Sequence, residues 1–125
     1  MHSLDQFAKK SYLNLETFHK SGESMKTPVW FVQEGDLLYI RTLANSGKVK
    51  RIRNNPRVNV VPCGMGGKPH GTWAPALAQR MHDPQLDQKV DHLLDKKYGL
   101  MRKVFSMRSR GPNQTYITLE VKLSE

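Results

Sequence analysis

The residues best suited to chemistry lie between Thr42 and Arg51, where a predicted strand ends and a predicted helix begins. Ser46 or Asn45 can cap this helix, and Gly47 permits a close approach of the backbone. The first N–H groups of a helix have no partner within it, and they lie at the positive end of its dipole. The sequence therefore predicts an anion site at this junction.

Hydroxyl and basic side chains accompany the predicted helix start. Thr42 and Ser46 supply hydroxyl donors. Lys48, Lys50 and Arg51 supply positive charge, although a helix directs them to different sides. Lys48 is the predicted phosphate contact because it lies in the first helical turn beside the cap. The alternative is an ordinary capped surface helix with solvated basic residues.

The distribution of charge favours an anionic ligand. The formal net charge is +9, and no acidic residue occurs between Asp36 and Asp83 or between Lys96 and Leu119. Uncompensated basic clusters attract phosphate on a nucleotide cofactor, a nucleic acid or a lipid, and charge alone does not distinguish these. The basic residues of the first stretch are Arg41, Lys48, Lys50, Arg51, Arg53, Arg57, Lys68 and Arg80.

Other arrangements that support catalysis or metal binding are missing from the sequence. The five histidines lack metal-ligand spacing, and neither a Gly-x-Ser-x-Gly elbow nor a paired-carboxylate site occurs. Gly64–Pro69 lacks the spacing of a phosphate loop and its Ser or Thr after Lys. No catalytic residue and no metal site is predicted, and the difficult chemistry would belong to a bound cofactor.

Neither Cys63 nor His70 is predicted to take part in chemistry. Cys63 follows the apolar run Val58–Pro62, which indicates a core thiol rather than a nucleophile. His70 lies in a glycine-rich loop near Trp73, where an exposed histidine is favoured over a ligand contact. A single cysteine cannot form an internal disulfide, which fits a reducing compartment.

Length and hydropathy define the class of protein. The 125 residues are predicted to form one domain, residues 1–125. Met1–Lys10 is too polar for a signal peptide, and no run approaches the ~18 apolar residues of a membrane span. The expectation is a cytoplasmic protein with no membrane partner.

Periodicity and turn residues predict the elements that position these side chains. Six strands with small inserted helices indicate a mainly β fold, a closed or nearly closed antiparallel barrel that the long helix plugs or flanks. The first three strands are predicted to form a meander, and Pro75 is predicted to interrupt the fifth. The strands are predicted over Tyr12–Phe18, Pro28–Val32, Leu37–Thr42, Arg57–Cys63, Thr72–Met81 and Gln114–Leu123, and the helices over Ser3–Lys10, Gly47–Arg53 and Pro84–Tyr98, the last with Asp83 as N-cap.

Several runs together resemble the pyridoxamine 5′-phosphate oxidase-like split-barrel superfamily. They are Thr17–Gly22, Thr27–Trp30 and Ser46–Val58, and the resemblance covers roughly residues 12–122. Within the superfamily, the chain is most similar to a branch of small proteins described as F420-dependent enzymes. Pro62, Cys63, Gly71, the strand around Ala78 and Lys96–Leu100 also fall where that branch has similar residues.

The resemblance implies a six-stranded, Greek-key-like split β-barrel that forms a homodimer, with cofactor sites at the dimer interface. Gly71, Trp73 and the Arg108–Arg110 region are the candidates for that interface. The substrate-binding C-terminal segment of the vitamin B6 oxidase has no counterpart here. Oxidation of pyridoxamine phosphate is therefore not expected.

The resemblance also implies a set of cofactor-binding residues. In the oxidase relatives a Thr-x-x-x-Ser-x-Lys pattern binds the phosphate of flavin mononucleotide (FMN), and Thr42, Ser46 and Lys48 match this pattern. Gly47 stands where relatives have a basic residue, so Lys50 or Arg51 is expected to substitute. The edge of the cofactor ring is expected along Thr27, Pro28, Val29 and Trp30, mainly through backbone groups.

The cofactor remains FMN or the deazaflavin F420 at this stage. The two share the ring and phosphate region, and F420 adds an acidic polyglutamyl tail that the surplus of Lys and Arg would suit. The same surplus also suits no more than one phosphate and a soluble surface. For Trp30, the alternative to a ring contact is a core aromatic of the barrel.

Three functions are compatible with these observations. The first is an oxidoreductase that transfers hydride between a bound flavin or deazaflavin and a small acceptor. The second is a non-catalytic cofactor-binding protein of the same fold. The third is a nucleic-acid-binding barrel, supported by the net charge and by Trp30, Phe31 and Tyr39 near basic residues. Nucleic acid is the less favoured partner because these aromatics lie within apolar strands.

Overall fold

The computed structural model describes residues 3–99, 101 and 115–124, and the Arg108–Arg110 region predicted for the interface lies outside them. One antiparallel sheet holds seven strands in the order β2-β1-β5-β6-β7-β4-β3. The strands are β1 (Tyr12–Phe18), β2 (Ser24–Val29), β3 (Val32–Glu34), β4 (Leu37–Leu43), β5 (Arg57–Cys63), β6 (Ala74–Met81) and β7 (Tyr116–Leu123). The helices are α1 (Gly47–Asn54), α2 (Pro84–Tyr98) and the short 3₁₀ helix η1 (Ser3–Phe7).

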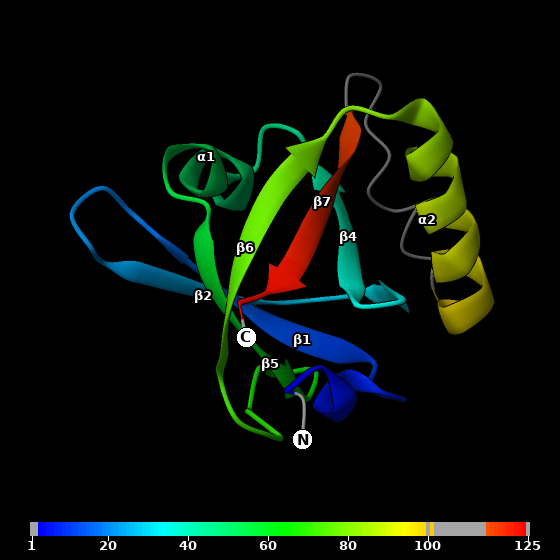
Figure 1. Ribbon diagram of the computed structural model, residues 1–125, viewed down its shortest axis with the longest axis horizontal. Helices are drawn as coiled ribbons and strands as arrows, with labels where there is room; N and C mark the ends of the chain where they lie inside the picture. Colours follow the sequence, from blue (N-terminus) through cyan, green and yellow to red (C-terminus); the bar gives the residue numbers. More distant parts are fainter. Residues whose placement is uncertain (1–2, 100, 102–114, 125) are drawn as a thin grey trace.

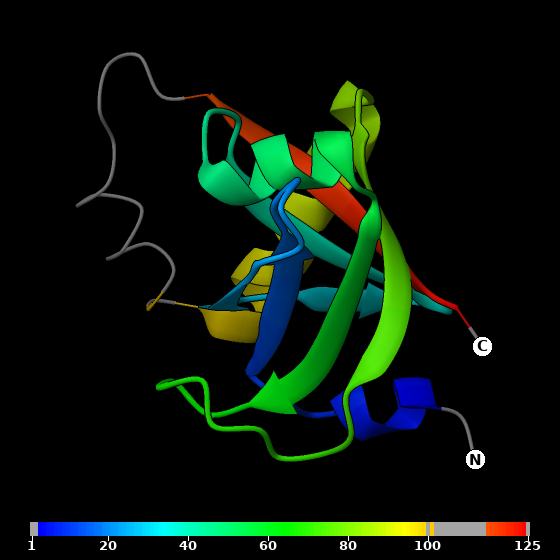
Figure 2. The same ribbon diagram turned by 90° about the vertical axis from the view of Figure 1, so that its left-hand side faces the viewer.

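The sheet curls into a split barrel. Strands β2 and β3 are its two end strands, yet only Trp30 and Phe31 separate them in the chain. The three Cα–Cα steps from Val29 to Val32 span at most about 11 Å, so the ends of the sheet must lie close together. Figures 1 and 2 show the resulting curl. The predicted mainly β split barrel is confirmed, with seven strands in place of six.

The extra strand comes from the segment predicted as one strand, Pro28–Val32. The chain leaves one end of the sheet after Val29 and joins the other end at Val32. Pro28 lies in β2, which pairs only with β1 and therefore has the free edge that the proline predicts. The predicted meander is wrong because its middle strand divides: β2 pairs with β1 and β3 pairs with β4, and these two pairs lie at opposite ends of the sheet order.

Pro75 lies inside β6 without interrupting it. Ladder pairing between β6 and β7 begins at Ala76 and Leu123, one residue further along β6. The carbonyl of Pro75 accepts a hydrogen bond from the N–H of Ser124 at 2.9 Å, so its missing N–H faces the end of β7. The strand therefore loses no ladder bond at this position.

Side chains from every wall fill the interior of the barrel. The helix α1 lies across one end and contributes Val49 and Ile52, while η1 lies at the other end (Figure 2). Phe7 of η1 meets Phe31 edge-on, with ring centroids 5.8 Å apart. Cys63 is buried, as predicted for a core thiol. Other core residues include Leu13, Leu15, Leu38, Ile40, Val58, Val60, Ala74, Ala76, Ala78, Leu119 and Val121.

The helix α2 flanks the barrel rather than plugging it (Figure 1). Its ends form as predicted: Asp83 accepts hydrogen bonds from the N–H groups of Gln85 and Leu86, and Gly99 ends the helix at φ +58°. Its buried stripe packs against the outer side of the sheet; this second cluster contains Val32, Tyr39, Val90 and Leu94.

No helix of the residues described here is long and apolar enough to cross a membrane.

The end of α2 holds the crossing between β2 and β3. The ring of Trp30 stacks on Tyr98, with centroids 4.5 Å apart and planes 11° apart. The Tyr98 hydroxyl accepts from the N–H of Phe31 at 3.1 Å and lies 2.7 Å from the carbonyl of Ser11. Lys97 donates to the carbonyl of Phe31 at 2.8 Å, and burial lowers its pKa to about 8.

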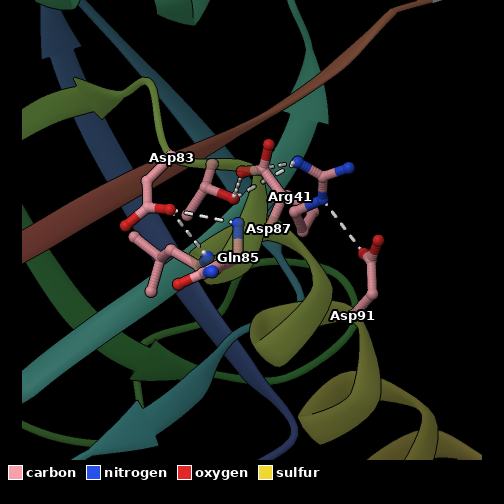
Figure 3. A network of polar contacts seen from close by, with 7 residues as sticks. Arg41, Asp83, Gln85, Asp87 and Asp91 are labelled. Atoms are coloured by element: carbon pink, nitrogen blue, oxygen red, sulfur yellow. Dashed lines mark hydrogen bonds and ion pairs between the residues drawn. The ribbon is translucent and has the colours of Figure 1, made fainter.

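Arg41 joins β4 to α2 and β7 in a polar network (Figure 3). Its guanidinium lies 3.2 Å from Asp87 and 3.0 Å from Asp91, and it also donates to the hydroxyl of Thr118 at 3.2 Å. That hydroxyl donates to Asp87 at 2.6 Å. Arg41 is therefore compensated, although the acid-free stretch around it suggested otherwise, because its partners come from a distant helix.

We expect Arg41→Met to lower the free energy of unfolding by about 1–3 kcal/mol, because two carboxylates would lose their shared cation. Urea unfolding followed by tryptophan fluorescence measures this change. Asp91→Asn is the matched control, since the Asp91 side chain is 38% exposed and the Arg41 side chain only 14%. An Arg41→Met variant as stable as the parent would show that the network adds nothing to stability.

Candidate functional site

The helix α1 forms because an apolar pair at helical spacing, Val49 and Ile52, can be buried in the barrel end. It ends where Asn55 becomes extended before Pro56. Ser46 is the N-cap by backbone position, and its carbonyl accepts from the N–H of Lys50 at 3.3 Å. The predicted side-chain cap is wrong at Ser46, because its Oγ is buried and has no partner among the described residues.

Lys48 turns toward the strand that precedes the helix. Its Nζ donates to the Oγ1 of Thr42 at 3.0 Å, and Thr42 is 9% exposed. Burial lowers the pKa of Lys48, and the nearby positive charge of Arg51 lowers it further. The sequence correctly associated Lys48 with Thr42, and the structure adds that the ammonium is partly removed from water.

Arg51 turns toward the first strand. Its Nε donates to the Oγ1 of Thr17 at 2.6 Å, and Thr17 is 1% exposed. One terminal nitrogen of its guanidinium lies 2.7 Å from the place a Cβ on Gly47 would occupy. A side chain at position 47 would therefore push the guanidinium away from the helix N-terminus.

These two bonds place α1 across the split of the barrel. Thr17 lies on β1 and Thr42 on β4, the second and sixth strands of the sheet. Lys48 and Arg51 are three residues apart, so their side chains are neighbours on the helix surface. One face of α1 thus brings two cations to the ends of β1 and β4 that lie away from the Trp30–Phe31 crossing.

The residues predicted to line a cofactor ring fall into two groups. Thr27 and Val29 pair with Leu15 and Leu13, so they share the inward side of the sheet on its free edge. Pro28 lies on the other face, near Gly67. Trp30 is directed to Tyr98 and α2, and it is neither a barrel-core aromatic nor a neighbour of the cations on α1.

A pocket of about 450 Å³ lies between α1 and the turn that follows β1. Gly47, Lys50 and Arg51 line it from the helix. The turn contributes His19, Lys20 and Ser21, which sequence reasoning treated only as turn residues. Their signal was the Thr17–Gly22 run of the resemblance, since periodicity cannot show that a turn folds back onto a helix.

The cations of α1 have no acidic partner among the described residues. The ion pairs formed within the described residues join Arg41 to Asp87 and Asp91, and Lys89 to Glu34, and none involves a residue of α1. Lys48 and Arg51 bond instead to neutral hydroxyl groups. The site can therefore accept an anion without first breaking an ion pair.

Neither a family model nor a curated protein matches this chain. Solved structures do match. HutZ, the heme storage protein of Vibrio cholerae, shares 13% identity over 97% of this chain and 87% of its own, with a TM-score of 0.73. A candidate pyridoxamine 5′-phosphate oxidase from Listeria innocua shares 12% identity over 98% and 90%, with a TM-score of 0.67.

A structure named F420 reductase also matches. It shares 14% identity over 97% of this chain and 92% of its own, with a TM-score of 0.63. Identities this low establish the architecture alone. The similarity spans nearly the whole of the chain. The chain therefore has the split-barrel fold of the pyridoxamine 5′-phosphate oxidase-like proteins.

Proposed function

We propose that this protein binds a flavin-type cofactor, FMN or F420, and transfers hydride between it and a small acceptor. One observation carries the proposal: hydroxyl groups gather at α1 with cations that make no ion pair within the described part of the chain. Neighbours named as an F420 reductase and a candidate pyridoxamine 5′-phosphate oxidase support the class of cofactor.

The residues present fit the phosphate of such a cofactor. Ser46 Oγ is buried and has no hydrogen-bond partner in the portion of the chain that the structure describes, and Lys48 uses one of its three donors on Thr42. The first N–H groups of α1 add further donors. Gly47 replaces a basic residue of the relatives, and the guanidinium of Arg51 lies over this glycine and supplies the charge in its place.

The edge strand β2 is the proposed place for the ring. Thr27 and Val29 face the inside of the split, and the outer edge of β2 has no strand partner. Its backbone groups are then available to the polar edge of a flat ring. When bound, the cofactor supplies the redox chemistry, and the chain orients it and compensates its charge.

F420 would use one more feature of the site than FMN. Lys20, Lys50 and Arg51 surround the pocket between α1 and the β1–β2 turn, next to the proposed phosphate position. An acidic tail would find compensating charge there. A direct comparison of the affinities for FMN and F420 decides between the two cofactors.

The nucleic-acid alternative loses its support from the aromatic residues. Phe31 and Tyr39 are 1% and 6% exposed, and Trp30 is stacked on Tyr98. Bases would need exposed rings for stacking. We therefore keep the redox proposal. A cytoplasmic location is proposed with it, as the single cysteine leads one to expect.

We expect Lys48→Ala to weaken binding of the preferred cofactor by about 1.5–3 kcal/mol, because it removes a charge-assisted contact. Parallel fluorescence titrations of the protein with FMN and F420 at physiological salt measure this change. Lys68→Ala is the control, since Lys68 is an exposed lysine of the glycine-rich loop. Equal affinity of Lys48→Ala and the parent would remove Lys48 from the site.

Catalysis is tested separately from binding. With an excess of chemically reduced cofactor supplied in solution, we expect multiple turnovers with a panel of small unsaturated acceptors, each turnover oxidising one cofactor molecule, and the absorbance of the cofactor follows the reaction. Lys48→Ala should lose activity at low cofactor concentration and regain it at saturation, because Lys48 acts on binding. Tight cofactor binding without turnover on the panel would favour the non-catalytic alternative.

We also propose that the protein is a homodimer. Met25, Met65 and Leu77 are large apolar side chains that are 47%, 75% and 52% exposed, and a dimer interface over them would remove this apolar surface from water. Trp73 is half-buried, with Lys26 over its ring at 5.5 Å, and Gly71 packs on Gln6. Sedimentation velocity should give twice the 14.3 kDa chain mass, whereas a monomer at micromolar concentration would contradict the dimer.

A further inference from the structure

A separate groove lies between α1 and the end of β6, and its volume is about 670 Å³. It is on a different side of the helix from the Lys48–Thr42 pair. Arg53 lines the groove and follows Lys48 by five residues, which corresponds to about 140° around a helix. Of the residues proposed to bind the cofactor, Lys50 alone also lines this groove.

The floor of the groove is apolar. Val49, Ile52 and Ala78 are 6%, 4% and 2% exposed, and they belong to the core of the barrel. Pro56 and Ala44 extend this apolar surface toward the rim. An apolar body in the groove would contact this floor and would cover mainly the more exposed Pro56 and Ala44.

The rim of the groove is basic. Lys50, Arg53, Arg80 and His82 line it, and all four residues are exposed. None of the three permanently charged side chains makes an ion pair within the part of the chain that the structure describes. The lining contains no acidic residue, so the groove has a positive potential without internal compensation.

We propose that this groove is a second binding site, for a small organic anion with an apolar body. The floor would contact the body, and Arg53 and Arg80, from the two elements that form the groove, would hold the anionic group. The shared chemistry is one carboxylate or phosphate on a short or flat apolar frame. A volume of this size falls in the range of small-molecule sites. The proposal does not depend on the cofactor assignment.

Calorimetric titration of the full chain tests the class of ligand. The probes are 2-naphthoate, 2-naphthyl phosphate and the neutral 2-naphthalenemethanol. We expect saturable binding of at least one anion, and at least tenfold weaker binding of the neutral probe. The tighter anion identifies carboxylate or phosphate as the recognised group. Equal binding of the neutral probe would overturn the proposal.

Two substitutions test the place of binding. Arg53→Gln and Arg80→Gln should each lower the affinity for the anion at least fivefold, because each removes one positive charge from the rim. Lys68→Gln removes the same charge from an exposed loop and should leave the affinity within twofold. An equal loss in Lys68→Gln would indicate general attraction to a basic protein and would overturn the site.

A third measurement separates this site from the proposed cofactor site and does not rely on Arg53→Gln or Arg80→Gln. Amide shifts caused by the anion should concentrate on Ala44, Ala78 and His82, which line the groove. They should persist in Lys48→Ala, whether or not that variant or its parent binds a cofactor. Shifts that instead follow Thr17, Thr27 and Thr42 would place the anion in the cofactor site and overturn the proposal.

Discussion

The two-residue crossing at Trp30 and Phe31 is the constraint on which the other features of this fold depend. It forces the two end strands of a seven-stranded sheet to meet, and so it creates both the closed interior and the split. The end of α2 stabilises the crossing through the Trp30–Tyr98 stack and the hydrogen bonds around Phe31. Lys97 and Tyr98 lie in the Lys96–Leu100 run that contributed to the family resemblance, and their contacts give that run a physical role.

Local signals predicted most of the elements. Asp83, Pro84 and Gly99 define the ends of α2, and Gly47–Arg53 falls within α1. What local signals did not predict was pairing between strands distant in the chain. Pro28–Val32 has the composition of one strand, and only the closure of the sheet divides it. Likewise Arg41 lies in an acid-free stretch, yet its carboxylates come from a helix more than forty residues later.

The candidate site was predictable to a similar degree. The Thr42-x-x-x-Ser46-x-Lys48 pattern of the resemblance assigned Thr42 and Lys48 to one phosphate site, and the structure shows the two side chains in contact where the strand ends and the helix begins. The bond from Arg51 to Thr17 spans thirty-four residues and depends on the curl of the sheet. The position of His19 and Lys20 beside α1 also depends on the curl of the sheet, which brings the turn after β1 to the helix. The direction of Trp30 was also not predictable, because it depends on where α2 packs.

Because α1 is attached through hydroxyl groups, its cations can exchange these partners for an anion. A lysine bound to a threonine hydroxyl can release it and leave behind a neutral group, whereas a lysine bound to a carboxylate would leave an unpaired charge. The helix is thus held by bonds that a stronger acceptor can replace one at a time. An arriving anion would compete with Thr42 and Thr17 for donors already in position, and little rearrangement of the barrel would be needed. The contacts that hold the helix across the split also keep its donors ready for a ligand.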